Sequence, residues 1–276
     1  MRPDQPLIFF VNPAGPVKSA TQFIAFSALF MWAGSTFGAQ TQCSAASGTT
    51  VTPVIELYTS EGCSSCPPAD KWASTFKEKS QEGAAVVQAF HVGYWDYIGW
   101  VDRFAAPAYT QRQREIGMRE GLRSAYTPQA VLNGKDWPRW PVGSPANVTQ
   151  AAAKALASAR ITLQQLGTDQ FEASVTPVVA PGGPAPAASW SAYWTVTEHG
   201  HNSKVKAGEN AGEFLKLDFV VRQYTPAGEY KTTSAPQKLT FRSIAPTPGH
   251  PRQVNLVVFN TQTGATLQAL SLQCAV

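Results

Sequence analysis

Two cysteines separated by two residues are the feature of this sequence that could most readily do chemistry. Cys63 and Cys66 follow an apolar run at residues 54–59 and precede two prolines. Such a pair can close a small disulfide ring or bind a metal ion, and a strand that leads through it into a helix is typical of thiol redox sites. We therefore predict a thioredoxin-like arrangement in which Cys63 is the more exposed and more reactive sulfur. No further cofactor is required, because the disulfide itself carries the electrons.

The residues around the pair also limit this prediction. Pro67 and Pro68 disfavour helical conformation in the residues before them, so the helix should begin at one of the prolines and leave the cysteines in the turn. Stabilisation of a Cys63 thiolate by the helix dipole is then weaker, and Ser64 and Ser65 supply no cation. A structural disulfide, or two reduced thiols packed under the turn, is the alternative interpretation.

The segments that follow the pair predict an α/β unit. Residues 69–76 have the spacing of an amphipathic helix, and residues 84–92 form a nearly continuous apolar run of strand length. Strand, helix and strand in this order predict a crossover between parallel strands. The further elements expected are an aromatic loop over 93–106, a helix from Pro107 to about Gly121, a short strand that turns at Asn133-Gly134, and a helix over 144–159. Together they complete a first domain, residues 40–160.

A proline opens the short strand of this domain. In thioredoxin-like folds, a proline at this place is cis and lies against the CxxC sulfurs, where it shapes the groove for a substrate chain. Although most X-Pro bonds are trans, this resemblance assigns Thr127 and Pro128 to a cis-proline loop.

From residue 161 the hydrophobic pattern changes to a period of two. Seven short runs of strand length are separated by turns, with no helical segment among them. This pattern predicts an all-β, antiparallel sandwich-like domain over residues 161–276. The polar stretch over 199–213, which contains Gly-Glu-Asn-Ala-Gly at 208–212, is interpreted as a connecting loop, with a functional role as the alternative.

The N-terminal region predicts export. Residues 23–32 are apolar or small, follow Lys18 and precede further small residues, a pattern typical of a secretory signal peptide, which we place at residues 1–39. A buried N-terminal helix is the alternative. An oxidising periplasmic or secreted location allows disulfides to persist, so Cys43 and Cys274 are predicted to form a structural disulfide. No membrane span is expected in the mature chain.

The composition excludes several classes of function. The 276 residues carry a formal net charge of +4, and 14% of them are charged. No cluster of Lys and Arg and no basic helix is present, so binding to nucleic acid is not expected. The sequence also lacks a glycine-rich phosphate loop, a GxSxG elbow and an HExxH motif.

Four segments together resemble a known family. They read SEGCSSCPPAD at 60–70, FHVGYWDYIGWVDRFAAPAYTQRQR at 90–114, YTPQAVLNG at 126–134 and GENAG at 208–212. These segments resemble the secreted bacterial family catalogued as domain of unknown function 1223. The resemblance implies a thioredoxin-like N-terminal domain, a β-rich C-terminal region, export to the periplasm and Cys63/Cys66 as the active pair. It supplies no reaction.

Three functions from different classes follow. The first is a thiol-disulfide oxidoreductase in which Cys63 exchanges with protein thiols or disulfides of the cell envelope and Cys66 resolves the mixed disulfide. The second is a non-catalytic binding scaffold stapled by its CxxC disulfide. The third is copper or zinc handling by the two cysteines and His91, for which a closed set of four ligands is hard to assemble. Four polar residues could lie near the cysteines, as a proton relay or a salt bridge: Asp96, Asp102, Arg112 and Arg114.

Overall fold

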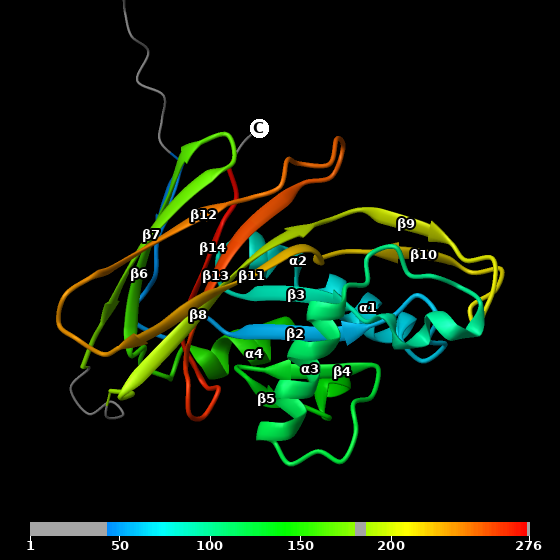
Figure 1. Ribbon diagram of the computed structural model, residues 1–276, viewed down its shortest axis with the longest axis horizontal. Coiled ribbons are helices and arrows are strands. Elements are labelled where there is room, and N and C mark those ends of the chain that lie inside the picture. Colours follow the sequence, from blue (N-terminus) through cyan, green and yellow to red (C-terminus); the bar gives the residue numbers. More distant parts are fainter. Residues whose placement is uncertain (1–42, 180–185, 275–276) are drawn as a thin grey trace, which may run out of the picture. The chain divides into compact units, whose positions relative to one another are not determined.

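The computed structural model describes residues 43–179 and 186–274, which form a mixed α/β protein that is mostly β (Figure 1). The predicted signal peptide, residues 1–39, lies outside the described residues. Helical elements are α1 (Pro67–Ser74), α2 (Lys77–Gln81), η1 (Gly93–Ile98), α3 (Pro107–Arg119), η2 (Trp140–Val142) and α4 (Pro145–Ala152). Strands are β1 (Ser44–Ala46), β2 (Val54–Thr59), β3 (Val86–His91), β4 (Gln129–Leu132), β5 (Lys135–Asp136), β6 (Ala159–Gly167), β7 (Gln170–Pro177), β8 (Ser189–Glu198), β9 (His201–Lys204), β10 (Phe214–Leu217), β11 (Val220–Lys231), β12 (Gln237–Arg242), β13 (Arg252–Asn260) and β14 (Thr266–Leu272). No helix in the described ranges is both long and apolar enough to cross a bilayer.

One eight-stranded sheet runs through both predicted domains, in the order β14-β13-β8-β11-β3-β2-β4-β5. Strands β2 and β3 are parallel, as the crossover pattern predicts, and β4 pairs with β2 in the antiparallel sense. The two halves join where β11 pairs with β3 at Val220 and Ala89. Residues on both sides of the predicted boundary between 160 and 161 contribute strands to this sheet, and the described residues fall in one compact unit. Period-two patterns identify strands but not their neighbours, so the shared sheet could not be predicted.

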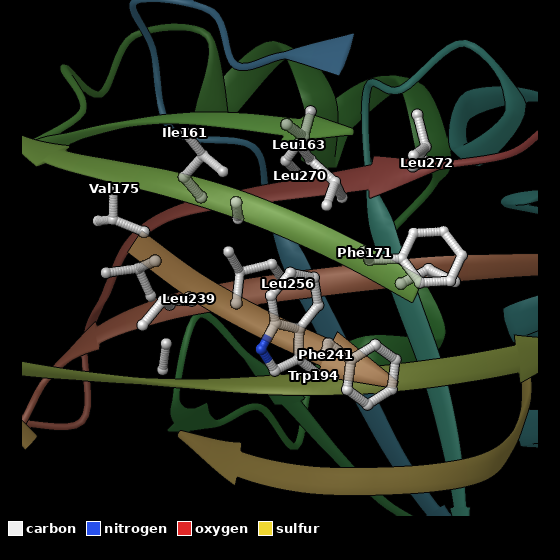
Figure 2. Packing of buried hydrophobic residues seen from close by; sticks show 14 of the residues in the cluster. Ile161, Leu163, Phe171, Val175, Trp194, Leu239, Phe241, Leu256, Leu270 and Leu272 are labelled. Carbon is white, nitrogen blue, oxygen red and sulfur yellow. The ribbon is translucent and has the colours of Figure 1, made fainter. Parts of the chain in front are cut away.

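The sandwich-like part packs a second sheet against one half of the first. This sheet has the order β1-β6-β7-β12. Its apolar face meets the inner side chains of β8, β13 and β14, and Trp194 stacks on Phe241 with ring centroids 5.0 Å apart (Figure 2). Full burial of one such large side chain contributes about 1.5–3 kcal/mol. Packing in this core holds β8 in place, and β8 leads into β9 and the loop of the candidate site.

Helices cover the other half of the long sheet. Ala69 and Ala73 of α1 and Val148 of α4 share a buried cluster with apolar side chains of β2 and β3. On the opposite face, Tyr109 and Ile116 of α3 lie in a second cluster with β2, β3, β8 and β13. The start of α1 is thereby fixed at the end of β2.

A disulfide joins Cys43 and Cys274, the pair suggested by the sequence, whose Cα atoms are 5.7 Å apart. Both cysteines pack against the core of the sandwich-like part. The bond links positions 231 residues apart, and closing a loop of that length stabilises a chain by about 5 kcal/mol in the entropy model.

Three segments differ from their sequence predictions. Residues 201–204 form β9, although residues 199–213 were interpreted as a loop. The helix predicted to reach residue 159 ends at Ala152. Residues 214–224, one of the seven runs of strand length, are divided between β10 and β11 at Phe219, whose φ is +57°. Strand β10 pairs with β9 in an antiparallel hairpin. The pattern of residues 214–224 does not show where β10 ends and β11 begins.

Candidate functional site

Cys63 and Cys66 are joined by a disulfide in the turn between β2 and α1. Cys66 is the N-cap of α1, its N–H donates to the carbonyl of Cys63 at 3.1 Å, and prolines occupy the first helical positions. The helix thus begins where the prolines predict. Both cysteines are 0% exposed, so the expectation of an exposed Cys63 is wrong.

Residues 208–212, here called the cap loop, bind the disulfide turn through hydrogen bonds. They connect β9 to β10, and Asn210 donates from Nδ2 to the carbonyls of Glu61 and Cys63, both at 2.9 Å. Glu209 accepts from the backbone N–H and the hydroxyl of Ser64, at 3.0 and 2.8 Å. A segment almost 150 residues away in sequence therefore lies over the CxxC turn.

The predicted cis-proline loop is connected to the same turn through Trp95. The Thr127–Pro128 bond is cis. Trp95 donates from Nε1 to the hydroxyl of Thr127 at 2.7 Å. A Cβ at Gly62 would stand 3.3 Å from the Cβ of Trp95, so Trp95 packs closely against this turn. The indole therefore lies between the disulfide turn and the proline loop.

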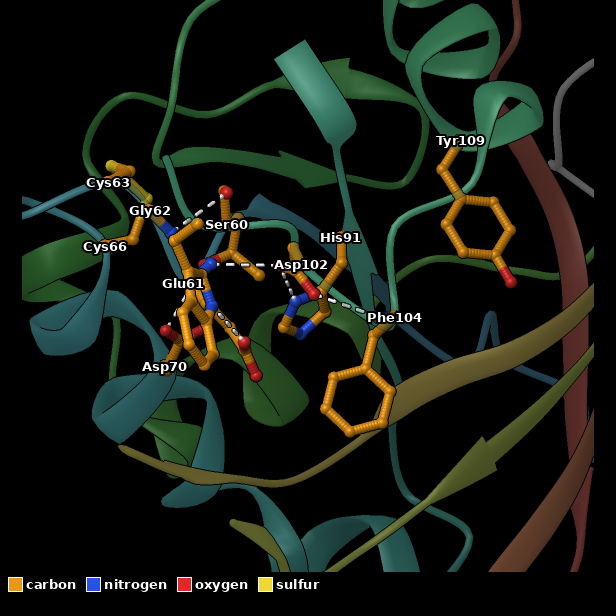
Figure 3. Close-up of polar contacts among 12 residues, drawn as sticks. Ser60, Glu61, Gly62, Cys63, Cys66, Asp70, His91, Asp102, Phe104 and Tyr109 are labelled. Carbon is orange, nitrogen blue, oxygen red and sulfur yellow. Dashed lines mark hydrogen bonds and ion pairs between the residues drawn. A yellow bond between two sulfur atoms is a disulfide. The ribbon is translucent and has the colours of Figure 1, made fainter. Parts of the chain in front are cut away.

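Four buried ionisable residues, here called the acidic cluster, lie next to the disulfide turn: Glu61, Asp70, His91 and Asp102 (Figure 3). Asp102 accepts from Nδ1 of His91 at 2.6 Å and from the backbone N–H of Glu61 at 2.9 Å. Glu61 accepts from Trp100 at 2.7 Å, and Asp70 accepts from the hydroxyl of Thr59 at 3.2 Å.

The acidic cluster holds more negative than positive charge, which separates the pKa values of its members. Burial raises the pKa of Asp70 to about 6, although the nearby His91 opposes the shift. Burial acts against the charged form of Asp102 as well, but the charge and hydrogen bond of His91 keep its pKa below the ordinary value. Burial also disfavours a charged His91 ring, yet attraction to Asp102 raises the pKa of His91. Asp70 can therefore gain or lose a proton near neutral pH.

Two atoms of the acidic cluster have no hydrogen-bonding partner among the described residues. They are Oε1 of Glu61 and Nε2 of His91, both buried. Buried polar atoms are normally paired, so such exceptions need an explanation. Unused hydrogen-bonding capacity next to a disulfide is compatible with a site that exchanges protons.

The polar residues named from the sequence separate into different environments. Asp102 belongs to the acidic cluster, and Asp96 supports it by accepting from the backbone N–H of Asp102 at 3.1 Å. Arg112 lies instead in the core, where it binds Glu56, and Arg114 is exposed. The sequence did not identify Glu61 and Asp70 as site residues. The only signal for them was that each is an acidic residue within four positions of a cysteine.

The metal hypothesis gains no support from the site. His91 directs Nδ1 toward Asp102 rather than toward a cysteine. Across residues 43–179 and 186–274, no three side chains of His, Cys, Asp and Glu are placed to hold a metal ion.

The sequence profile of the family described as Protein of unknown function (DUF1223) matches residues 54–260, which include the disulfide turn, the acidic cluster and the cap loop. The chain belongs to this family. No curated protein matches the chain.

Two solved structures are similar to this DUF1223 member over most of its length. A structural-genomics protein of Agrobacterium tumefaciens is 23% identical with a TM-score of 0.58, covering 82% of this chain and 96% of that one. HBP35 of Porphyromonas gingivalis is 14% identical with a TM-score of 0.56, covering 81% of this chain and 75% of that one. At these identities the similarity shows the fold alone.

Proposed function

We propose that this DUF1223 member is an exported thiol-disulfide exchange protein that acts through Cys63 and Cys66. The observation that carries the proposal is the position of the disulfide, in the turn from a central parallel strand into a helix and beside buried acids. The order β2, α1, β3, α3 and β4, with Pro128 just before β4, supports a thioredoxin-like description of this half.

The proposed reaction transfers two electrons from a partner dithiol to the Cys63–Cys66 disulfide. A partner thiolate attacks the sulfur of Cys63, the Cys63–Cys66 bond breaks, and Cys66 leaves as a thiolate. The partner's second thiol, after losing its proton, then attacks the mixed disulfide and releases Cys63. The partner ends as a disulfide and this protein as a dithiol, and the reverse sequence oxidises a partner.

Asp70 is the group we assign to proton exchange during this reaction. It follows Cys66 by one helical turn, and its backbone N–H donates to the carbonyl of Cys66 at 3.1 Å. Because its pKa is about 6, the protonated carboxyl can supply the proton that the departing Cys66 thiolate takes up, and the carboxylate can take it back.

Access to Cys63 requires the cap loop to move. Both cysteines are buried, and Asn210 and Glu209 bind the turn that holds them. Gly208 and Gly212, at the two ends of the loop, have φ of +75° and +94°, backbone conformations in which glycine is unstrained. We assign opening of this loop to the step that precedes attack by a partner.

A structural disulfide in a binding scaffold is the second candidate, because complete burial of both cysteines favours it. A redox titration in glutathione buffers, with differential alkylation read by mass spectrometry, separates the two. The exchange function predicts that the Cys63–Cys66 pair reaches equilibrium with glutathione at a potential above about −300 mV, whereas structural disulfides usually lie lower.

The Cys43–Cys274 disulfide is an internal control for this titration, because it should stay oxidised in the same samples. A Cys66→Ser variant should trap partners from an envelope extract as mixed disulfides with Cys63. A pair that remains oxidised throughout, with no trapped partner and no reduction or oxidation of a model disulfide protein, would replace the exchange function by the scaffold.

Export is the remaining part of the proposal. It is supported by two disulfides in the described chain, since such bonds persist in oxidising compartments, and by the signal-like pattern of residues 23–32. Cell fractionation with N-terminal sequencing tests it, and a cytoplasmic, uncleaved product would contradict it.

A further inference from the structure

A cationic pocket separate from the disulfide lies beside β9. Its volume is about 380 Å³, and its lining includes Arg103, Phe104, His201, Arg222 and His250. The guanidinium carbons of Arg103 and Arg222 lie 4.5 and 5.2 Å from the centre of the Phe104 ring. The rings of His201 and His250 are stacked at 3.8 Å. Two permanent cations and two imidazoles thus converge around one aromatic ring.

Only one of the two arginine charges is balanced within the pocket. Glu198 is 0% exposed and accepts from Nε2 of His201 at 2.8 Å and from Arg222 at 3.2 Å. Its other oxygen accepts from the backbone N–H of Thr247 at 2.9 Å. Arg103 forms no ion pair with the described residues, and both oxygens of the buried carboxylate already accept hydrogen bonds. Counting the two arginines and Glu198, the pocket therefore keeps one positive charge.

Both guanidinium groups retain donors that could bind an anion. Arg103 donates from one terminal nitrogen to the carbonyl of Asn202 at 2.7 Å, and Arg222 uses one terminal nitrogen for Glu198. Among the described residues, the other nitrogens of both groups have no hydrogen-bond acceptor. The bond to Asn202 and the packing on Phe104 hold Arg103 in place before any ligand arrives, which reduces the entropy lost on binding.

From this arrangement we propose that the pocket binds a carboxylate, held between Arg103 and Arg222 above Phe104. One negative charge balances the pocket, and the flat carboxylate matches the two N–H groups on one edge of a guanidinium. The carboxylate belongs either to a small organic acid or to the end of a peptide. The site is independent of the disulfide chemistry, so either proposal can fail alone.

Isothermal titration calorimetry on the full chain with intact disulfides tests the proposal. The probes are succinate, acetylated trialanine with a free C-terminal carboxylate, the same peptide amidated, and inorganic phosphate at equal ionic strength. We expect saturable binding of succinate or of the free-acid peptide, and none of the amide. Tighter binding by succinate identifies a small acid as the ligand class, and tighter binding by the peptide identifies a chain end.

Arg103→Gln should weaken carboxylate binding about tenfold, as expected for the loss of one charged hydrogen-bond donor. Arg160→Gln is the matched control, because Arg160 also donates to a backbone carbonyl, that of Gly48 at 2.6 Å, but lies outside the pocket. Arg222→Gln should act like Arg103→Gln, with thermal unfolding measured to confirm folding. Absence of carboxylate binding, phosphate binding without carboxylate binding, or equal loss in the Arg160 variant would each overturn the proposal.

Discussion

Strand β2 and the turn that follows it carry two buried clusters of polar side chains. The clusters differ in their charge balance and in how many of their polar atoms have hydrogen-bond partners. At Glu56 within the strand, both carboxylate oxygens bind Arg112 at 2.7 Å. Tyr58 and Tyr193 donate to the same carboxylate at 2.7 and 3.1 Å. Burial disfavours the Glu56 charge, but Arg112 and the two hydroxyls keep its pKa low. This group is neutral overall and its acceptors are paired.

The acidic cluster after the strand has neither property. Three carboxyl groups face one imidazole, and two buried atoms have no partner among the described residues. Burial alone does not identify a functional group, because both sets are buried. Balanced charge and paired acceptors indicate a structural role, while excess charge and a pKa near neutrality, as at Asp70, are what proton exchange requires.

The largest effect is expected in the balanced group. Arg112→Met leaves the Glu56 carboxylate buried without its cation, and breaking a buried pair in this way costs about 3–5 kcal/mol. Denaturation in urea at neutral pH measures the loss. The double variant Glu56→Leu with Arg112→Met should be more stable than Arg112→Met alone, because no charge stays buried. Equal or lower stability of the double variant would contradict this account.

Asp70→Asn should have the opposite sign. The pKa of Asp70 is 3.8 in its reference state and about 6 when folded, so the unfolded chain ionises first as pH rises. The difference of about 2 units corresponds to about 3 kcal/mol, which the folded state loses progressively between about pH 4 and pH 6. At pH 7 the Asn variant should therefore be more stable than the wild type, by up to about 3 kcal/mol.

Stability measured across pH 4–7 checks this prediction. The fall in stability with rising pH should be smaller in the Asn variant by the amount assigned to Asp70. Glu78→Gln, at an exposed position of α2, is the control and should leave the wild-type slope nearly unchanged. A variant with the wild-type slope would mean that Asp70 is not the raised group.

Local parts of the fold could be predicted from the sequence because their signals lie within a few residues. Pro67 and Pro68 place the start of α1, and Pro107 places the start of α3. The Asn133-Gly134 pair predicts the turn between β4 and β5, where its φ angles are +52° and +83°.

The candidate site could be predicted only in part. Cys63 and Cys66 are named by their spacing, but the bond to their turn from Asn210, almost 150 residues away, is not. Glu61 and Asp70 look like solvent-exposed residues when read within their own segments. In the fold they are buried, and Glu61 binds Asp102 and Trp100 from a loop about 40 residues away. Contacts between distant segments leave no periodic pattern in a sequence.

His91→Gln tests the electrostatic coupling within the acidic cluster. His91 is the group whose charge lowers the pKa of Asp70 against burial, so its removal should raise that pKa above the wild-type value. Carboxyl chemical shifts of Asp70, followed by NMR during a pH titration, measure the change. His201→Gln is the matched control, since His201 is also buried and binds a carboxylate, that of Glu198, at 2.8 Å. A similar shift in both variants would indicate a general effect on folding.

The smallest effect on stability is expected at Glu209, which is exposed. The backbone N–H and the hydroxyl of Ser64 donate to the Glu209 carboxylate and lower its pKa. The carboxylate is therefore charged at neutral pH and binds the turn tightly. Glu209→Gln keeps an acceptor but removes the charge, and hydrogen bonds to ionised groups are about twice as strong as neutral ones.

The cap loop of the Glu209→Gln variant should therefore open more often, and dithiothreitol should reduce the Cys63–Cys66 disulfide roughly threefold faster. Because the Cys43–Cys274 disulfide packs against the core of the sandwich-like part rather than against the cap loop, its reduction rate in the same samples should not change. If both rates rose together, the variant would have loosened the whole protein, and if neither changed, the loop would not control access to the disulfide.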